Sequence, residues 1–305
     1  MEYKILNSHL MNNLKIISLL LLISLGFYGC EKIVDNVNIP EQQPKVVVNC
    51  YISPEDTLIS AYVSLSAPIW STTYVDNNMP VTNATVIISN NTTQAQLVYN
   101  YQKSCYIIHT SAFPIQADVT YKLAVSVPGY SSVEATCKVP VLINQSLQFL
   151  SFDSVSGDQN STEYRFKVEF TDFSGIGNYY RIGGILISLY DNGMGGSDTT
   201  YNTLNIKNNE EFIFDKDIDG QVILSELNYW KGNYDMPSSG SEKLIKLKVF
   251  LLTTDDNYYQ FHKTLSSYTG DDPFSEPTIV FSNVQNGLGV FASYRKYTIN
   301  YNFPN

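Results

Sequence analysis

Histidine and tryptophan are both scarce in this sequence, and the scarcity of histidine narrows the chemistry the chain can perform. Among 305 residues there are three histidines and two tryptophans, and only His109 and His262 remain once the leader described below is removed. Zinc sites and Ser–His–Asp triads need histidines in close geometry, which two distant ones supply poorly. The motifs G-x-S-x-G, P-loop and H-E-x-x-H are missing, and no carboxylate spacing indicates a glycosidase pair. We therefore expect no enzyme.

Basic residues are also in deficit. The chain has 19 Lys and Arg against 29 Asp and Glu, a formal net charge of −10. Removing residues 1–29 takes away Lys4, Lys15 and Glu2, which leaves 17 basic and 28 acidic residues. This balance argues against nucleic acid and against anionic lipid as electrostatic partners.

Long hydrophobic runs are missing too, apart from one short run near the N-terminus. Ile16 to Phe27 is apolar apart from serine and glycine, and Lys15 precedes it. Twelve residues are too few to span a hydrocarbon core, which needs about 20. We interpret residues 1–29 as a signal peptide, with Met11 as an alternative start, and Cys30 as the lipid-anchored first residue of the mature chain. An ordinary signal peptide with a chance cysteine is the alternative. Residues 30–44, polar and containing two prolines, read as a lipidated tether.

Cysteine is limited to four residues, and lipidation of Cys30 leaves an odd number in an exported chain. Cys50 and Cys137 fall in the first and last predicted strands of the N-terminal region, so they are the pair to test for a disulfide. Three buried, unpaired thiols are an equally good interpretation, because free cysteine packs as a small hydrophobe.

Strand patterns dominate the remainder, which predicts a mainly all-β fold. Seven short alternating segments within residues 45–140 indicate an immunoglobulin-like β-sandwich. They are 46–52, 58–65, 84–88, 96–99, 106–108, 120–127 and 133–139. A second β-rich domain is expected over residues 141–305. Its strands are predicted at 164–170, 180–190, 211–214, 221–224, 244–252, 278–281, 289–294 and 297–301. One helix is predicted near 255–268, where Tyr258, Phe261, Leu265 and Tyr268 share a helical face.

One local motif has the spacing of a metal site. Asp215, Asp217, Asp219, Gln221 and Glu226 match the twelve-residue calcium loop D-x-D-x-D-G-x5-E. Calcium takes six to eight oxygen ligands, which these residues could supply, so calcium is the candidate cofactor. The flanking sequence reads as strand on both sides, however. An extended chain would carry Glu226 away at about 3.3 Å per residue, and a hairpin turn is the alternative.

Aromatic residues in loops are the candidate contact residues. Trp70 and Tyr74 lie in one predicted loop, and Tyr229 and Trp230 lie in another. Such side chains supply a large contact area at low entropy cost and could also stack on sugars. The alternative is that they cover the ends of the hydrophobic cores, because tryptophan is usually well buried.

Several stretches carry a family resemblance. They are Cys30-Glu31-Lys32, residues 46–50, residues 80–86, residues 272–277 and the block 282–291, in which Asn-Gly-Leu-Gly-Val-Phe is most specific. Together they resemble a domain-of-unknown-function family of outer-membrane lipoproteins from Bacteroidota. Members commonly lie beside TonB-dependent (SusC-like) receptors, so the resemblance implies an accessory role at such a receptor but supplies no functional residues.

These observations lead to one functional expectation. We expect a lipid-anchored outer-membrane protein, facing the cell surface, that acts as a non-enzymatic binding component of TonB-dependent nutrient uptake. Its partners would be membrane lipid, through Cys30, and a TonB-dependent receptor. The alternatives are a carbohydrate-binding module and an enzyme that degrades an extracellular polymer.

Overall fold

The computed structural model describes residues 43–67, 79–141, 146–157, 161–175, 177–191, 196–231, 242–268 and 279–304. Strands dominate these residues, and a single α-helix occurs among them, so the predicted all-β class is confirmed. The predicted signal peptide, Cys30 and nearly all of the predicted tether lie outside the described residues. None of the described helices is long and apolar enough to cross a membrane.

The first part of the fold contains the seven strands that the alternating pattern predicts. They are β1 (Val46–Ile52), β2 (Leu58–Leu65), β3 (Thr85–Ser89), β4 (Gln94–Asn100), β5 (Cys105–His109), β6 (Thr120–Ser126) and β7 (Val133–Lys138). Strand β4 pairs with β3 through one half and with β5 through the other. The buried residues of β1, β2 and β5 share one hydrophobic core with those of β3, β6 and β7. These two groups of strands therefore face each other. The immunoglobulin-like assignment stays a prediction.

The second part is built from longer strands. They are β8 (Gln148–Ser156), β9 (Thr162–Thr171), β10 (Tyr179–Asp191), β11 (Ser197–Thr203), β12 (Asn205–Ile206), β13 (Phe212–Phe214), β14 (Val222–Lys231), β15 (Glu242–Thr254) and β16 (Leu288–Asn302). Strands β12, β14, β9 and β8 form a four-stranded sheet, while β10, β11, β13, β15 and β16 belong to the larger sheet. Buried side chains of both sheets, including Phe166, Ile182 and Leu247, form a second hydrophobic core.

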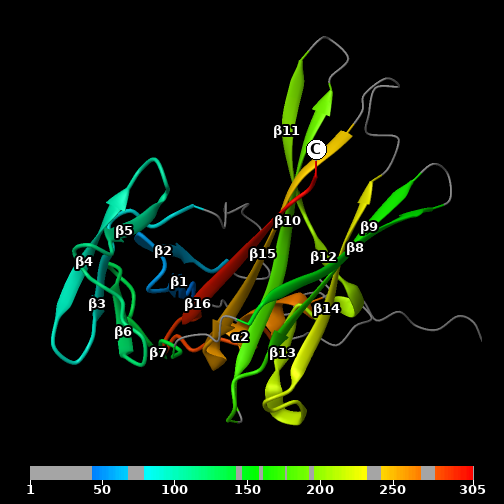
Figure 1. Cartoon of the computed structure of the whole chain (residues 1–305). Helices are drawn as coiled ribbons and strands as arrows, with labels where there is room; N and C mark the ends of the chain where they lie inside the picture. The colour runs from blue at the N-terminus through cyan, green and yellow to red at the C-terminus, as the bar shows by residue number, and fades with distance from the viewer. Residues whose placement is uncertain are drawn as a thin grey trace, which may run out of the picture. The chain divides into compact units, whose positions relative to one another are not determined.

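Strand β16 joins the two parts (Figure 1). Residues Leu288 to Ser293 pair in parallel with β1, and Tyr294 to Asn302 pair antiparallel with β15. Phe291 packs in the first core, whereas Ile299 packs against the second. The predicted boundary at residue 140 stays a prediction, and the last strand pairs with strands on both sides of it. The structure also replaces the two short strands predicted at 289–294 and 297–301 with this single strand.

Glycine lets β16 approach β1 closely. Gly289 has φ +105°, and a Cβ atom there would lie 2.1 Å from the Val48 carbonyl oxygen of β1. Only glycine accepts both this backbone conformation and this approach. The preceding Asn283 receives a hydrogen bond from the Phe291 amide (3.0 Å) and donates one to the Phe291 carbonyl (2.8 Å). The most family-specific block of the sequence therefore holds β16 against β1.

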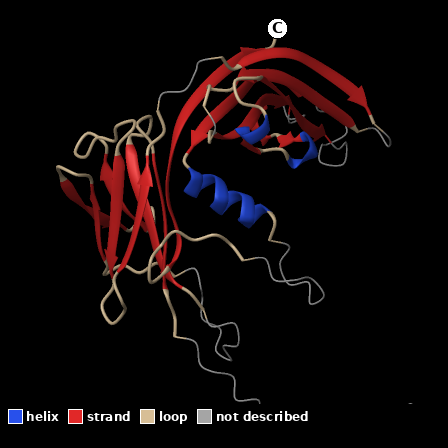
Figure 2. Cartoon of the chain, turned by 90° about the horizontal axis from the view of Figure 1, so that it is seen from below, coloured by secondary structure: helices blue, strands red, loops and turns tan. Residues whose placement is uncertain are grey.

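The helix α2 (Asp256–Ser266) follows β15 and packs on the larger sheet (Figure 2). Asp255 caps it by accepting a hydrogen bond from the Tyr258 amide at 2.9 Å. Tyr258 is buried, and Phe261 packs against the same cluster. Two sequence predictions in this region fail. Leu265 and Tyr268 are exposed, and the described residues 279–281 form no strand.

Candidate functional site

The predicted calcium loop begins directly after strand β13. Asp215 to Asp217 form a short 3-10 helix, and Gly220 adopts φ +69° just before β14 begins. The segment connects β13 to β14, which lie in different sheets, so the alternative of a hairpin turn is wrong. It packs instead against the segment after β9, which contains Asp172 and the two left-handed glycines Gly175 and Gly177.

Three carboxylates converge where these two segments meet. Asp172, Asp215 and Asp219 each offer an oxygen within 4.8 Å of the others. Asp172 accepts hydrogen bonds from the Tyr180 hydroxyl (2.6 Å) and the Gly220 amide (2.7 Å). Asp215 accepts from the Gly177 amide (2.9 Å), and Asp219 accepts from the Gly175 amide (2.7 Å). Backbone amides therefore hold the three carboxylates in position.

The charge of this cluster is unbalanced within the described part of the chain. Asp215 is fully buried and Asp172 is 2% exposed. None of the ion pairs between described residues involves these three aspartates. Bringing buried like charges together is unfavourable unless a cation or protons neutralise them. A hard cation with oxygen preference, such as calcium, fits this donor set.

The structure brings together only part of the predicted ligand set. Asp217 is exposed and lies outside the cluster, and the Gln221 carbonyl accepts the Asp172 amide at 2.8 Å. Glu226 lies well along β14 and forms an ion pair with Lys207 at 3.0 Å. The predicted ligand set is therefore wrong in part. Asp215 and Asp219 belong to the cluster, and Asp172 takes the place of Asp217, Gln221 and Glu226. Sequence spacing could not reveal Asp172, because it precedes Asp215 by 43 positions.

The predicted contact aromatics separate in the structure. Tyr229 and Trp230 are neighbours on β14, so their side chains point to opposite faces of the sheet. Tyr229 packs against the second core, whereas Trp230 is 53% exposed. Tyr229 therefore fits the alternative of core covering, and Trp230 fits a contact role. Trp70 and Tyr74 lie outside the described residues.

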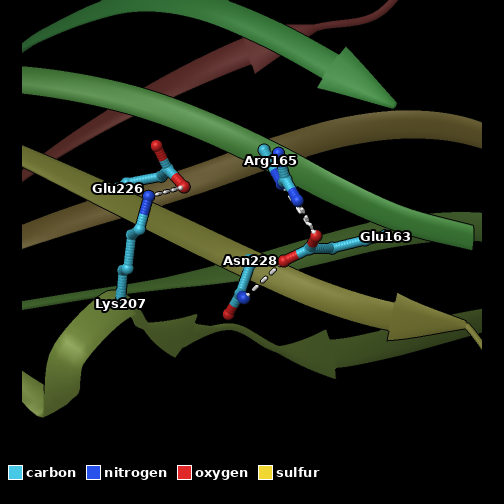
Figure 3. Close-up of polar contacts among 5 residues, drawn as sticks. All are labelled: Glu163, Arg165, Lys207, Glu226 and Asn228. Carbon is cyan, nitrogen blue, oxygen red and sulfur yellow. Dashed lines mark hydrogen bonds and ion pairs between the residues drawn. The ribbon is translucent and has the colours of Figure 1, made fainter. Parts of the chain in front are cut away.

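A polar network of Glu163, Arg165, Asn228, Lys207 and Glu226 lies on the outer face of the four-stranded sheet (Figure 3). Trp230 pairs with Glu163 in the register of β14 and β9. Glu163 is 5% exposed and accepts from Arg165 Nε (2.7 Å) and from Asn228 Nδ2 (2.8 Å). The hydrogen bond from Arg165 holds the pKa of Glu163 below its usual value. Lys207 and Glu226 extend the network along β14. Beside it lies a depression of about 250 Å3 lined by Ser151, Phe152, Asp153, Arg165, Lys167 and Glu226.

Two larger cavities lie elsewhere. A cavity of about 370 Å3 is lined by residues of several elements, including Asp118, Lys138, Tyr179, Asp255 and Asp256. Burial raises the pKa of Asp255 to about 7. Each carboxylate there already has a structural partner, since Asp255 caps α2, Asp118 pairs with Lys138 at 2.7 Å and Asp256 accepts from Gln260.

The second cavity, of about 630 Å3, contains Arg181 and Glu211, whose side chains are hydrogen-bonded to each other at 2.6 Å. Beside Arg181, His262 stacks among aromatic rings. Burial lowers its pKa to about 4, so it is neutral at physiological pH.

The predicted disulfide is not formed. Cys50, Cys105 and Cys137 are all buried free thiols. Burial raises the pKa of Cys50 and of Cys137, which makes both poor nucleophiles. Their role in the structure is packing, because Cys50 and Cys137 belong to the first hydrophobic core.

Comparison with known proteins identifies the family of the chain. No curated protein sequence matches the chain. A family model described as a domain of unknown function (DUF4249) matches residues 34–300. The match begins four residues after Cys30 and includes the β16 block, the carboxylate cluster and the Trp230 network. The chain therefore belongs to the DUF4249 family.

Proposed function

We propose that this chain is a lipid-anchored outer-membrane protein that acts as a non-enzymatic binding component of a TonB-dependent uptake system. The leader and Cys30 support the anchor, and the acidic composition suits a solvated exterior. The proposal that it works beside a receptor extends from the family resemblance. Two exposed apolar side chains on one sheet face, Tyr62 and Val98, are the observation that carries a binding role.

That surface lies on the outer face of β2, β5 and β4. Tyr62 is 54% exposed and Val98 is 69% exposed. The strand registers place both side chains, together with Ile107, on the same face of adjacent strands. Contiguous apolar patches are uncommon on monomeric proteins and mark interaction sites, and Ile107 on β5 connects Tyr62 with Val98 across this face. We assign this face to contact with the receptor.

Co-purification tests this assignment. The double variant Tyr62→Ser/Val98→Ser should lose the receptor in gentle detergent extraction, while Trp230→Ala, on a different sheet, should retain it. Retention of the receptor by the double variant would contradict the assignment, and recovery of the wild-type chain alone would contradict the accessory role. Cys30→Ala should move the chain from the membrane to the soluble fraction. A variant that stays membrane-bound would contradict the anchor.

The carboxylate cluster supports a second, structural proposal. We propose that calcium binds Asp172, Asp215 and Asp219. The burial of two of these groups, with no ion-pair partner among the residues that the structure describes, favours it. The ion would fasten the end of β9 to the start of β14, since Asp172 follows β9 and Asp219 precedes β14.

The rival reading is a polymer-degrading enzyme. The cavity beside Asp255 and Asp256 is the feature that favours it, because the carboxyl group of Asp255 titrates near neutral pH. A reducing-end assay on polysaccharides, with Asp255→Asn as the inactive control, decides between hydrolysis and binding. Release of reducing ends by the wild type alone would overturn the non-enzymatic proposal.

A further inference from the structure

The outer face of the four-stranded sheet combines an exposed indole with a strip of polar and charged side chains. Residues paired across antiparallel strands point to the same side. The registers therefore place Trp230 beside Glu163, Asn228 beside Arg165, and Glu226 beside Lys167. Strand β8 adds Ser151 and Asp153 to the same face, opposite Lys167 and Arg165. An aromatic ring at one end thus continues into a polar strip.

Trp230 lies close to the neighbouring hairpin while remaining accessible. Its Cζ3 atom lies 3.2 Å from the position that a Cβ atom would take at Gly157, the residue that follows β8. Glycine thus leaves room for the indole at the end of the β8–β9 hairpin, and 53% of the Trp230 residue remains exposed. A half-exposed indole offers a flat apolar surface to a ligand.

The polar strip next to the ring is equally well positioned. Glu163 is buried beneath the network, and its two oxygens hold the Arg165 guanidinium and the Asn228 amide. These two groups thereby keep a fixed orientation. The Arg165 side chain is 39% exposed, so it retains access to a ligand. The depression of about 250 Å3 opens directly beside it.

Charges on this strip nearly balance one another. The acidic side chains Asp153, Glu163 and Glu226 accompany the basic ones Arg165, Lys167 and Lys207. Glu169, opposite Leu224, adds a fourth acidic group at the far end of the same face. The strip therefore attracts neither polyanions nor polycations, and the acidic chain as a whole disfavours polyanions further. A ligand that suits it is uncharged, with one apolar face for the indole and a rim of hydroxyl groups for the mixed donors and acceptors. Sugar rings combine these properties.

We propose that the outer face of β8, β9 and β14 binds a neutral oligosaccharide, with one ring stacked on Trp230 and the following units along Asn228 and Arg165 toward the depression. From Trp230 to Glu226 the strand extends about 13 Å, which requires an oligosaccharide rather than a single sugar. The inference deepens the proposed binding function and rests on it, because it names the ligand class that the protein would present to the receptor.

Binding of defined glycans to the full chain tests the inference. The probes are soluble neutral α-glucan, β-glucan, xylan and mannan oligosaccharides, measured by isothermal titration calorimetry and by tryptophan fluorescence. At least one should bind, and Trp230→Ala should weaken it about tenfold or more, as expected for a central aromatic contact. Trp230→Phe should retain part of the affinity. Binding should change little between about 50 and about 500 mM salt, because the ligand is uncharged.

The double variant Tyr62→Ser/Val98→Ser is the matched control, because it removes exposed apolar groups from a different sheet and should bind the glycan normally. Circular dichroism and thermal melting confirm that each variant is folded. Absence of binding to every probe, or unchanged binding by Trp230→Ala, would overturn the inference. So would a Trp230-dependent protein partner in place of a glycan. Glycan binding without receptor co-purification would instead refute only the receptor proposal.

Discussion

Replacing Asp215 with Asn should separate the carboxylate cluster of the structure from the linear calcium loop of the sequence. Asp215 is fully buried and shares the cluster with Asp172 and Asp219. Asn keeps an oxygen that can accept the Gly177 amide but removes one negative charge. Asp217 lies in the same loop and is exposed, outside the cluster. Asp217→Asn therefore makes the same chemical change in the same segment without touching the cluster.

The size of the effect follows from linkage. Extracellular calcium sites have dissociation constants of roughly 10⁻⁴ to 10⁻³ M. At about 10 mM calcium, a site with a constant near 10⁻⁴ M stabilises the fold by about 2.7 kcal/mol. For a protein of this size, that free energy corresponds to a rise in the unfolding temperature of about 5 to 10 °C. The wild type and Asp217→Asn should both show this rise between EDTA and calcium.

Asp215→Asn should show little of the rise. In EDTA its stability should lie close to that of the wild type, because the removal of a buried negative charge that repels its two neighbours offsets the loss of the hydrogen bond that Asn178 Nδ2 donates to Asp215 Oδ2 at 3.1 Å. Differential scanning calorimetry in EDTA, calcium and magnesium gives the comparison, with magnesium controlling for ionic strength. Equal loss of the calcium response in Asp217→Asn would refute the structural cluster. A wild type that melts at the same temperature in EDTA and in calcium would refute the site altogether.

Three further predictions concern the fold. Gly289→Ala should lower the free energy of unfolding in urea by roughly 3 kcal/mol or more, because it combines a positive φ with a clash against Val48. The control Gly129→Ala, with φ +84° and open space around it, should lower that free energy by only about 1 kcal/mol. Burial raises the pKa of Asp255 from 3.8 to about 7. The contribution of this group to stability is therefore complete below about pH 4 and is lost as the pH rises toward and through 7. Asp255→Asn keeps the helix cap, so its urea midpoints, measured at several pH values, should not show this loss. The buried thiols should react with Ellman's reagent only after unfolding, and reaction of the native chain would contradict their burial.

Alternating patterns located most strands, because a half-buried strand must alternate wherever it covers a core. Strands β8 and β11 were missed, since most residues in both are exposed and carry no alternation. The strand expected at 278–281 failed for the opposite reason. Its described residues, 279–281, are strongly strand-forming, yet the Phe281 amide donates to the Thr264 hydroxyl instead of to a neighbouring strand. A high strand propensity does not by itself provide a neighbouring strand with which the segment can pair.

The sequence by itself determined the features that depend on local chemistry, namely the strand-rich class, the helix near 255–268 and the acidic balance. The leader and Cys30 stay predictions. Only the tertiary structure decided the features that depend on distant partners. It placed Asp172 beside Asp215 and Asp219, separated Tyr229 from Trp230, and set Glu163 beneath Arg165 and Asn228. It also showed that Gly289 lets β16 approach β1 closely, while the end of the same strand pairs with β15. Contacts of this kind arise from strand order and register, which residue spacing along one chain does not encode.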